Sequence, residues 1–168
     1  MKYLPQFFPA FWTVEYEVFG LPFTDEICIG FVERKYGGYS YLLNDEFVKL
    51  KIKPKDLLKI SINNLENEIE NCNIKVYKLG SGSIAFWCSM NDNFTAVRFL
   101  SHKYLSLLKK IFNNDFYFSI PHRDLITCWQ TMDKDEMEKY ENETIEDFDN
   151  SDYKLSKKVY RFDEIQLI

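Results

Sequence analysis

Residues 116–129 constrain the fold of this chain more than any other stretch, with the sequence FYFSIPHRDLITCW. Apolar residues alternate with smaller or polar ones from Phe116 to Ile120, and a second apolar run extends from Leu125 to Trp129, so each predicts a buried strand. Pro121 and the polar residues His122–Asp124 separate the two runs. We therefore expect two strands with a break at Pro121 and a group of ionisable side chains between them.

Short strands joined by tight turns account for most of the other apolar runs. Residues 26–43 predict a hairpin, because Gly37 and Gly38 form a turn signal between two strand-like runs. Further strands are expected in four ranges, the first three as an antiparallel meander and the last as a closing strand: 74–79, 84–90, 94–100 and 153–168.

Helices are predicted where apolar residues recur at three- and four-residue spacing. The first begins at Pro54, where the missing amide hydrogen costs nothing, and runs to about residue 71. The second follows Ser101, whose hydroxyl can accept a bond from the first turn, and ends near residue 113. Part of the segment 133–152 predicts a third helix, with one stripe of less polar residues: Met137, Tyr140, Thr144 and Phe148.

This order of elements predicts an α+β fold, with antiparallel strands in hairpins and a meander packed with two to three helices. A chain of 168 residues with 46% hydrophobic residues is sufficient for one domain with its own core. We expect a single α+β domain over residues 1–168. Within it, residues 1–20 are predicted to form an aromatic N-terminal arm on the surface, and 133–152 an acidic helical segment.

The start of the chain lacks the pattern of a secretory signal. Pro5 and Pro9 interrupt its apolar residues, and Glu15 follows soon after. No run approaches the ~20 apolar residues of a membrane-spanning helix. The cysteines lie far apart, each in or beside an apolar run, which predicts free and buried thiols. We expect a soluble, cytoplasmic protein.

Acidic residues are concentrated in one segment. The net charge is −5, yet residues 133–152 hold ten Asp or Glu residues against Lys134 and Lys139, a net of −8, so the remainder totals +3. This segment repels phosphates, and no nucleic-acid partner is expected for it. Two interpretations remain open: a solvated helix face, or a negative surface that binds a basic partner.

A family resemblance accompanies these patterns. Residues 119–126, SIPHRDLI, resemble the strand–Pro–polar–Asp–strand stretch of the YtpQ-like family of uncharacterised bacterial proteins. Residues 42–64 resemble the family's polar turn followed by a helix, and the strand pair around 84–87 and the helix after Ser101 come in matching order. The similarity covers about residues 20–130 and only the later part of longer members. It implies an α+β fold and a bacterial origin, and no activity.

The group His122-Arg123-Asp124 invites two catalytic hypotheses. In a protein kinase an Asn five residues after the Asp binds a metal ion, whereas Trp129 occupies that place here, so we exclude a kinase. A hydrolase would use Cys128 or Ser119 as nucleophile, with His122 as base and Asp124 as its orienting carboxylate. The alternative, which we favour, is that Asp124 pairs with a cation such as Arg123 and fixes a strand crossing.

Other motifs predict no chemistry. The run Gly80-Ser81-Gly82-Ser83 lacks a lysine and precedes a strand, so it predicts a hairpin turn rather than a phosphate loop. His102 is expected at an exposed helix start. With two histidines and no clustered carboxylates among the strands, we expect no metal site and no other cofactor.

These patterns favour a non-enzymatic cytoplasmic binding protein, of an immunity or antitoxin-like type that blocks a basic toxin or nuclease domain with its acidic face. We expect aromatic anchors inside a charged rim to contact the partner: Tyr140, Glu141, Glu143, Glu146, Asp147 and Phe148. The competing hypotheses are the hydrolase using His122, Asp124 and Cys128, and an accessory protein whose role belongs to its longer relatives. No membrane partner is expected, and no oligomeric state is indicated.

Overall fold

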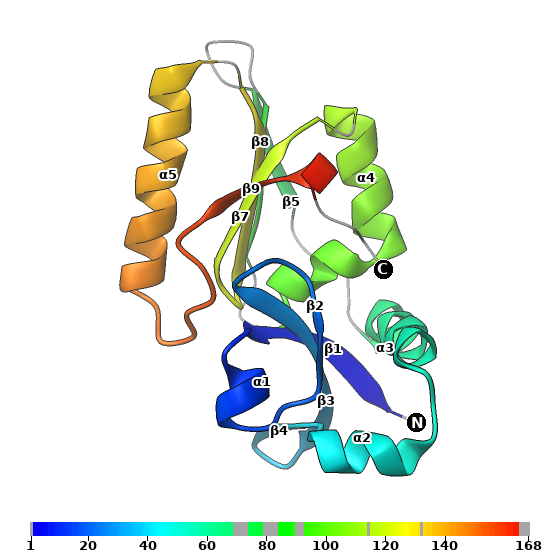
Figure 1. Cartoon of the computed structure of the whole chain (residues 1–168). Helices are drawn as coiled ribbons and strands as arrows, with labels where there is room; N and C mark the ends of the chain where they lie inside the picture. Colours follow the sequence, from blue (N-terminus) through cyan, green and yellow to red (C-terminus); the bar gives the residue numbers. More distant parts are fainter. Residues whose placement is uncertain are drawn as a thin grey trace. The chain divides into compact units, whose positions relative to one another are not determined.

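In the computed structural model of the chain (Figure 1), the described residues are 2–68, 74–78, 84–89, 93–113, 115–131 and 133–164, without the side chains of 68, 74–78, 84–89 and 164. They form two compact units, one with the described residues up to 68 and one with those from 74 to 164. The predicted α+β class with antiparallel strands is confirmed. One domain over 1–168 stays a prediction.

The first unit contains one antiparallel sheet and three helices within residues 2–68. Its strands are β1 (Tyr3–Pro9), β2 (Gly20–Pro22), β3 (Ile27–Lys35) and β4 (Gly38–Tyr41). Its helices are α1 (Trp12–Glu15), α2 (Asn44–Leu50) and α3 (Pro54–Glu68). The sheet order is β1-β3-β2, with β4 pairing β3 as the predicted hairpin. Helix α3 begins at Pro54 as predicted and reaches β1, where Asn64 Nδ2 donates to the Tyr3 carbonyl at 2.8 Å.

Residues 3–9 form strand β1, where the sequence had predicted a surface arm. Phe7 and Phe8 are each only 1% exposed, because both faces of this strand are covered. A strand buried on both faces has no alternating pattern, which is why its apolar residues resembled an arm. Pro5 and Pro9 are tolerated because β1 pairs only with β3 and lies at the edge of the sheet.

The second unit contains an antiparallel sheet with the order β5-β6-β8-β7-β9. Its strands are β5 (Ile74–Lys78), β6 (Ile84–Ser89), β7 (Tyr117–His122), β8 (Leu125–Gln130) and β9 (Val159–Arg161). Its helices are the 3-10 helix η1 (Ala96–Leu100), α4 (His102–Phe112), α5 (Lys134–Asp149) and the 3-10 helix η2 (Phe162–Glu164). The turn run Gly80–Ser83 lies outside the described residues.

The strand predicted at 94–100 is instead the 3-10 helix η1. Strand β6 pairs with β5 on one side and with β8 on the other, from Ile84 opposite Gln130 to Ser89 opposite Leu125. Residues 94–100 therefore cannot pair with β6 as the next strand of the predicted meander. All residues of η1 are buried. Its sequence is therefore mainly apolar, as the sequence of a buried strand would be. The closing strand of 153–168 is shorter than predicted: β9 pairs with β7 over three residues.

Helices cover both faces of the second sheet, as Figure 1 shows for α5 on one side and α4 on the other. On the α5 side the ring of Trp129 stacks on Tyr140 at 4.7 Å. On the α4 side Phe99 stacks on Phe118 at 4.9 Å, and Phe112 on Phe116 at 5.1 Å. Burial of each such ring contributes about 1.5–3 kcal/mol before entropy is counted, so aromatic stacking holds this unit together.

Side chains fix where the two long helices of this unit begin. Ser101 Oγ accepts a bond from the Tyr104 amide at 3.2 Å, so the predicted cap of α4 is confirmed. Asp133 Oδ1 accepts from the amides of Asp135 and Glu136 at 2.9 and 3.0 Å. Such a cap is typically worth about 1 kcal/mol, and it fixes the start of α5 at Lys134, four residues after the last residue of β8.

Candidate functional site

The polar group after Pro121 lies in the tight turn between β7 and β8. Arg123 and Asp124 form the turn, and His122 pairs with Leu125 across it. Strand β7 continues through Pro121 to His122, so Pro121 does not end the strand as the sequence had indicated. Instead the register shifts between Ser119 and His122, an irregularity that accommodates a residue with no amide hydrogen.

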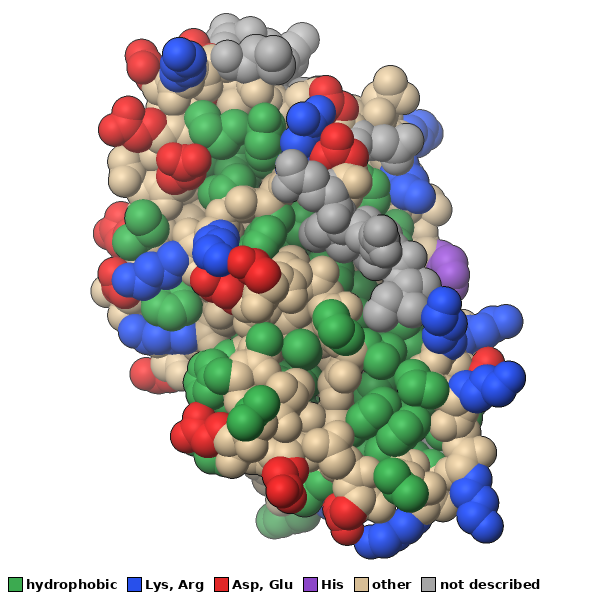
Figure 2. Space-filling model, in the orientation of Figure 1, with side chains coloured by type: hydrophobic (Ala, Val, Ile, Leu, Met, Phe, Trp, Pro, Cys, Tyr) green, Lys and Arg blue, Asp and Glu red, His purple; other side chains and the backbone are tan. Residues whose placement is uncertain are grey.

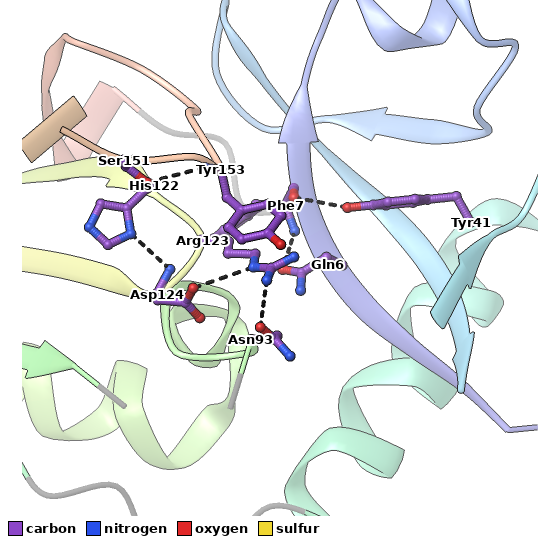
Figure 3. Close-up of polar contacts among 9 residues, drawn as sticks. All are labelled: Gln6, Phe7, Tyr41, Asn93, His122, Arg123, Asp124, Ser151 and Tyr153. Atoms are coloured by element: carbon purple, nitrogen blue, oxygen red, sulfur yellow. Dashed lines mark hydrogen bonds and ion pairs between the residues drawn. The ribbon is translucent and has the colours of Figure 1, made fainter. Parts of the chain in front are cut away.

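Arg123 is the centre of this turn (Figure 3). Its Nη2 donates to Asn93 Oδ1 at 2.6 Å, and its Nε donates to Asp124 Oδ2 at 3.3 Å. The guanidinium carbon lies 3.2 Å from the centroid of the Tyr153 ring. The backbone adds two bonds, from Ala96 N to the Arg123 carbonyl and from Arg123 N to the Tyr153 carbonyl. Arg123 therefore ties the turn to two segments distant in sequence.

His122 is held as a hydrogen-bond acceptor. The Asp124 amide donates to His122 Nδ1 at 3.3 Å, which requires an unprotonated Nδ1. Burial lowers the pKa of His122, while the nearby carboxylates of Asp124 and Asp147 oppose the shift and Arg123 adds to it. A neutral imidazole at neutral pH follows from both observations.

The structure does not bring either predicted nucleophile, Ser119 or Cys128, to His122. Cys128 lies opposite Phe118, on the sheet face turned away from α5, and it is fully buried. Its burial raises the pKa of the thiol well above the usual value, so the thiolate is suppressed. Ser119 is 1% exposed, and no hydrogen bond joins it or Cys128 to His122 among the described atoms.

Asp124 also does not orient the imidazole as a catalytic carboxylate would. Its Oδ2 pairs with Arg123, and its Oδ1 is buried without a hydrogen-bond partner in the described part of the chain. The bond to His122 comes from the Asp124 backbone amide and not from its carboxylate. The turn thus has the local ion pair expected for a structural role, and within the described part of the chain Cys128, His122 and Asp124 do not form a nucleophile–base–carboxylate array.

The acidic segment 133–152 contains helix α5, which packs by one stripe and exposes the rest. Tyr140 is 7% and Thr144 3% exposed, and Met137 and Phe148 are half-buried on the same side. On the opposite side five exposed residues follow helical spacing, and we call them the outer stripe: Asp135, Glu138, Asn142, Ile145 and Glu146. Figure 2 shows acidic side chains along α5.

The residues predicted to contact a partner are divided by this packing. Glu141, Glu143, Glu146 and Asp147 are exposed, as a binding surface requires. Tyr140 is not available, because its ring faces Trp129 in the interior. Asp147 lies at the edge next to the sheet: burial raises the pKa of its carboxyl, and His122 opposes that shift.

Two lysines from the following segment contact Phe148 and Asp149. Lys157 Nζ lies 2.7 Å from Asp149 Oδ1, and Lys154 Nζ donates to the Asp149 carbonyl at 3.1 Å. Both ammonium groups also lie over the Phe148 ring, at 5.1 and 5.2 Å. The lysines supply positive charge where the carbonyls at the helix end are negative, so they neutralise the last turn of α5.

Sequence reasoning missed the lysine contacts and the exposed Ile145. The basic run Lys154–Lys158 directly follows the acidic helix, and opposite charges so close in sequence could have indicated the contact. Ile145 is 41% exposed and lies off the buried stripe by helical spacing. It is the apolar residue of the outer stripe, between Glu138 and Glu146.

No group of three or more His, Cys, Asp or Glu side chains suited to a metal ion is found in the described residues. Within that same part of the chain, no helix has the length and apolar character needed to cross a membrane. No protein-family model, curated protein or solved structure matches this chain. The resemblance to the YtpQ-like family therefore stays a prediction.

Proposed function

We propose that this chain is a non-enzymatic binding protein of the bacterial cytoplasm, which docks a basic protein through the outer stripe of α5. The observation that carries the proposal is the set of three exposed carboxylates along the stripe that also contains Ile145. Asp135, Glu138 and Glu146 make no ion pair with any described residue, whereas Glu143 pairs with Lys139 at 3.7 Å and Asp149 with Lys157.

An unneutralised acidic surface with one apolar residue suits recognition of a basic groove. The carboxylates attract and orient a cationic partner over a distance of about 8–10 Å at physiological salt. Ile145 offers an apolar contact inside the charged rim, in the place that the sequence had assigned to Tyr140 and Phe148. Helix α5 presents this stripe on a fixed support, because Tyr140 is locked against Trp129.

The particular form we propose is an immunity or antitoxin-like protein whose partner is a basic toxin or nuclease domain. Such a partner binds a polyanion in its active cleft, and an acidic helix competes for the same positive surface. This form rests on charge complementarity, and the concentration of the net −8 in residues 133–152 supports it.

The experiment is a pull-down from the native lysate with three tagged proteins: wild type, the double variant Glu138→Lys/Glu146→Lys, and the control Asp25→Lys/Glu66→Lys. Both variants change the net charge equally, but the control residues are exposed side chains of the first unit. We expect one stoichiometric basic protein with wild type and control, lost with the α5 variant and at high salt.

Equal capture by all three proteins, or capture that is insensitive to salt, would refute docking through the outer stripe. Circular dichroism of each protein verifies that the variants fold. The immunity form is tested by co-expressing the captured partner in a host: wild type should relieve growth arrest and the α5 variant should not. Absence of any growth arrest by the partner would exclude the toxin form while leaving the docking result intact.

A further inference from the structure

Four aromatic rings form a continuous row on one face of the first unit. Each ring is nearly perpendicular to the next: Tyr39 and Tyr41 at 5.7 Å and 81°, Tyr41 and Trp12 at 5.7 Å and 84°, Trp12 and Tyr16 at 5.5 Å and 85°. The rings come from β4 and α1, and from Tyr16, which ends α1. We call this set the aromatic row.

The aromatic row is accessible to solvent. Tyr16 is 53% exposed, and its neighbours Phe11 and Val14 are 58% and 84% exposed. The other three rings are half-buried, and two of them, Trp12 and Tyr41, pack against the buried Phe8. Figure 2 shows hydrophobic side chains with acidic ones beside them over the α1 region. Exposed apolar surface of this kind is typical of a binding site rather than of a solvated helix.

The two middle rings of the row, Trp12 and Tyr41, are held in place before any ligand binds. Phe8, which is buried, lies under both Trp12 and Tyr41, at 6.2 and 5.5 Å. The Tyr41 hydroxyl donates to the Phe7 carbonyl at 3.3 Å, as Figure 3 shows. At the other end, a hydrogen bond to the Glu15 carboxylate raises the pKa of Tyr16. Rigid Tyr and Trp side chains give contact area at low entropic cost.

We propose that the aromatic row binds a proline-rich peptide segment in the polyproline II conformation, with Arg or Lys at one end of the segment. Perpendicular neighbouring rings leave notches between them, and pyrrolidine rings are compact, flat-sided groups that fit such notches. Two steps along the row span at most twice 5.7 Å. One turn of a polyproline II helix advances about 9 Å over three residues, so prolines three apart reach alternate notches.

Charged residues beside the aromatic row determine which end of the peptide lies at which end of the row. Glu15 and Glu17 are exposed at the Tyr16 end of the row, where carboxylates favour a cationic residue of the ligand. At the other end, Arg34 pairs across the hairpin with Tyr39. The same carboxylates disfavour a nucleic acid, whose phosphates they would repel. This site is separate from the outer stripe of α5 and independent of the proposed function.

The test uses fluorescence polarisation of the full chain with a labelled synthetic peptide that carries repeated Pro-x-x-Pro units and two arginines at one end. We expect saturable binding that weakens about tenfold or more in Tyr16→Ala, because one exposed ring bounding a notch is removed. Tyr36→Ala is the matched control, since Tyr36 is a fully exposed tyrosine of the β3–β4 turn outside the row. It should leave the affinity unchanged.

Two further measurements test the contribution of the prolines and that of the cationic peptide end separately. A peptide with every proline replaced by glycine should bind at least about tenfold more weakly, and Glu15→Gln/Glu17→Gln should remove the preference for arginine over glutamate at the peptide end. Equal binding of the glycine peptide, equal binding by Tyr16→Ala, or no saturable binding of the proline-rich peptide would overturn the proposal. Displacement of the peptide by a β-linked oligosaccharide, with tighter binding of the sugar, would overturn it too.

Discussion

The ring of Tyr140 stacks on the ring of Trp129, with centroids 4.7 Å apart and an interplanar angle of 27°. This contact places an aromatic residue of the acidic helix α5 inside the second unit. The indole Nε1 of Trp129 is buried and has no hydrogen-bond partner among the described atoms, so the contact is made by apolar packing. One ring pair therefore decides which side of α5 can be a binding surface.

We predict that Tyr140→Ala destabilises the protein by about 3–5 kcal/mol, the range for deleting a buried aromatic ring. The ring's removal leaves a cavity beside Trp129, and α5 loses its main attachment. Urea unfolding followed by Trp fluorescence measures the loss. Tyr36→Ala removes a fully exposed tyrosine and should cost less than about 0.5 kcal/mol; equal losses in the two variants would contradict the packing role.

A second prediction concerns acid sensitivity through His122. Burial lowers the pKa of folded His122 below the ordinary 6.5, so the unfolded chain binds the proton first as pH falls. Stability is lost as pH falls from about 6.5 through the lower folded pKa. His122→Asn removes this titration, and its amide oxygen can still accept the Asp124 amide. The free energy of unfolding of the variant should depend less on pH in that window.

The matched control for His122 is His102→Asn, which changes an exposed histidine at the start of α4 and retains His122. It should keep the part of the pH dependence that comes from His122. The raised pKa of Asp147 gives an opposite slope at more acidic pH, because the folded state then binds the proton more readily. If the wild type and His122→Asn show the same slope below pH 6.5, the buried neutral state of His122 is wrong.

Arg123→Lys should destabilise the second unit by about 1–3 kcal/mol, although it keeps the charge. The planar guanidinium reaches Asn93 and Asp124 and covers the Tyr153 ring at once, which an ammonium cannot do. Arg161→Lys is the control: Arg161 pairs with Asp115 and Asp163 but is 44% exposed, and its change should cost less than about 1 kcal/mol. Thermal and urea unfolding give both values. A smaller loss at position 123 than at 161 would disprove the anchoring role.

Gly30→Ala should destabilise the first unit by about 1–3 kcal/mol through overpacking. A Cβ at Gly30 would lie 2.8 Å from the Phe8 ring and 3.1 Å from the Tyr41 ring. Gly38→Ala is the control, because no atom lies within 4 Å of a Cβ at Gly38. This change should lower the free energy of unfolding far less. Phe8→Leu in the Gly30→Ala background should recover part of the loss, because the two sites share the contact. Additive losses in the double variant would show that the ring is not the obstacle.

Local patterns predicted the elements whose signals lie within a few residues. The β3–β4 turn lies at Tyr36 and Gly37, one residue before the predicted Gly37-Gly38. This turn, the Pro54 start of α3 and the Ser101 cap of α4 are each determined by the conformation of nearby backbone. The two strands around the polar group were predicted for the same reason, but the break was placed at Pro121, whereas the chain turns at Arg123 and Asp124. The ion pair of Arg123 with Asp124 joins adjacent residues. Such features need no knowledge of the rest of the chain.

Elements that depend on distant partners were predicted less well. Strand β1 was taken for a surface arm because its strand character comes from pairing with β3, some twenty residues later. The run 94–100 has the apolar composition of a strand, but β8 occupies the sheet position beside β6. Apolar composition indicates burial, and only strand pairing decides between a strand and a 3-10 helix.

The sequence by itself determined the α+β class, the acidic helix and the two strands on either side of the polar group 122–124, because hydrophobic period, charge and polar breaks are local properties. Only the tertiary structure decided which of those side chains are buried, paired or exposed. Tyr140 is turned inward by the Trp129 ring, and Asp149 is neutralised by Lys157 from beyond the helix end. The physical reason is that the accessibility of a side chain depends on which segments pack against its helix. The sequence of the helix alone does not specify those segments.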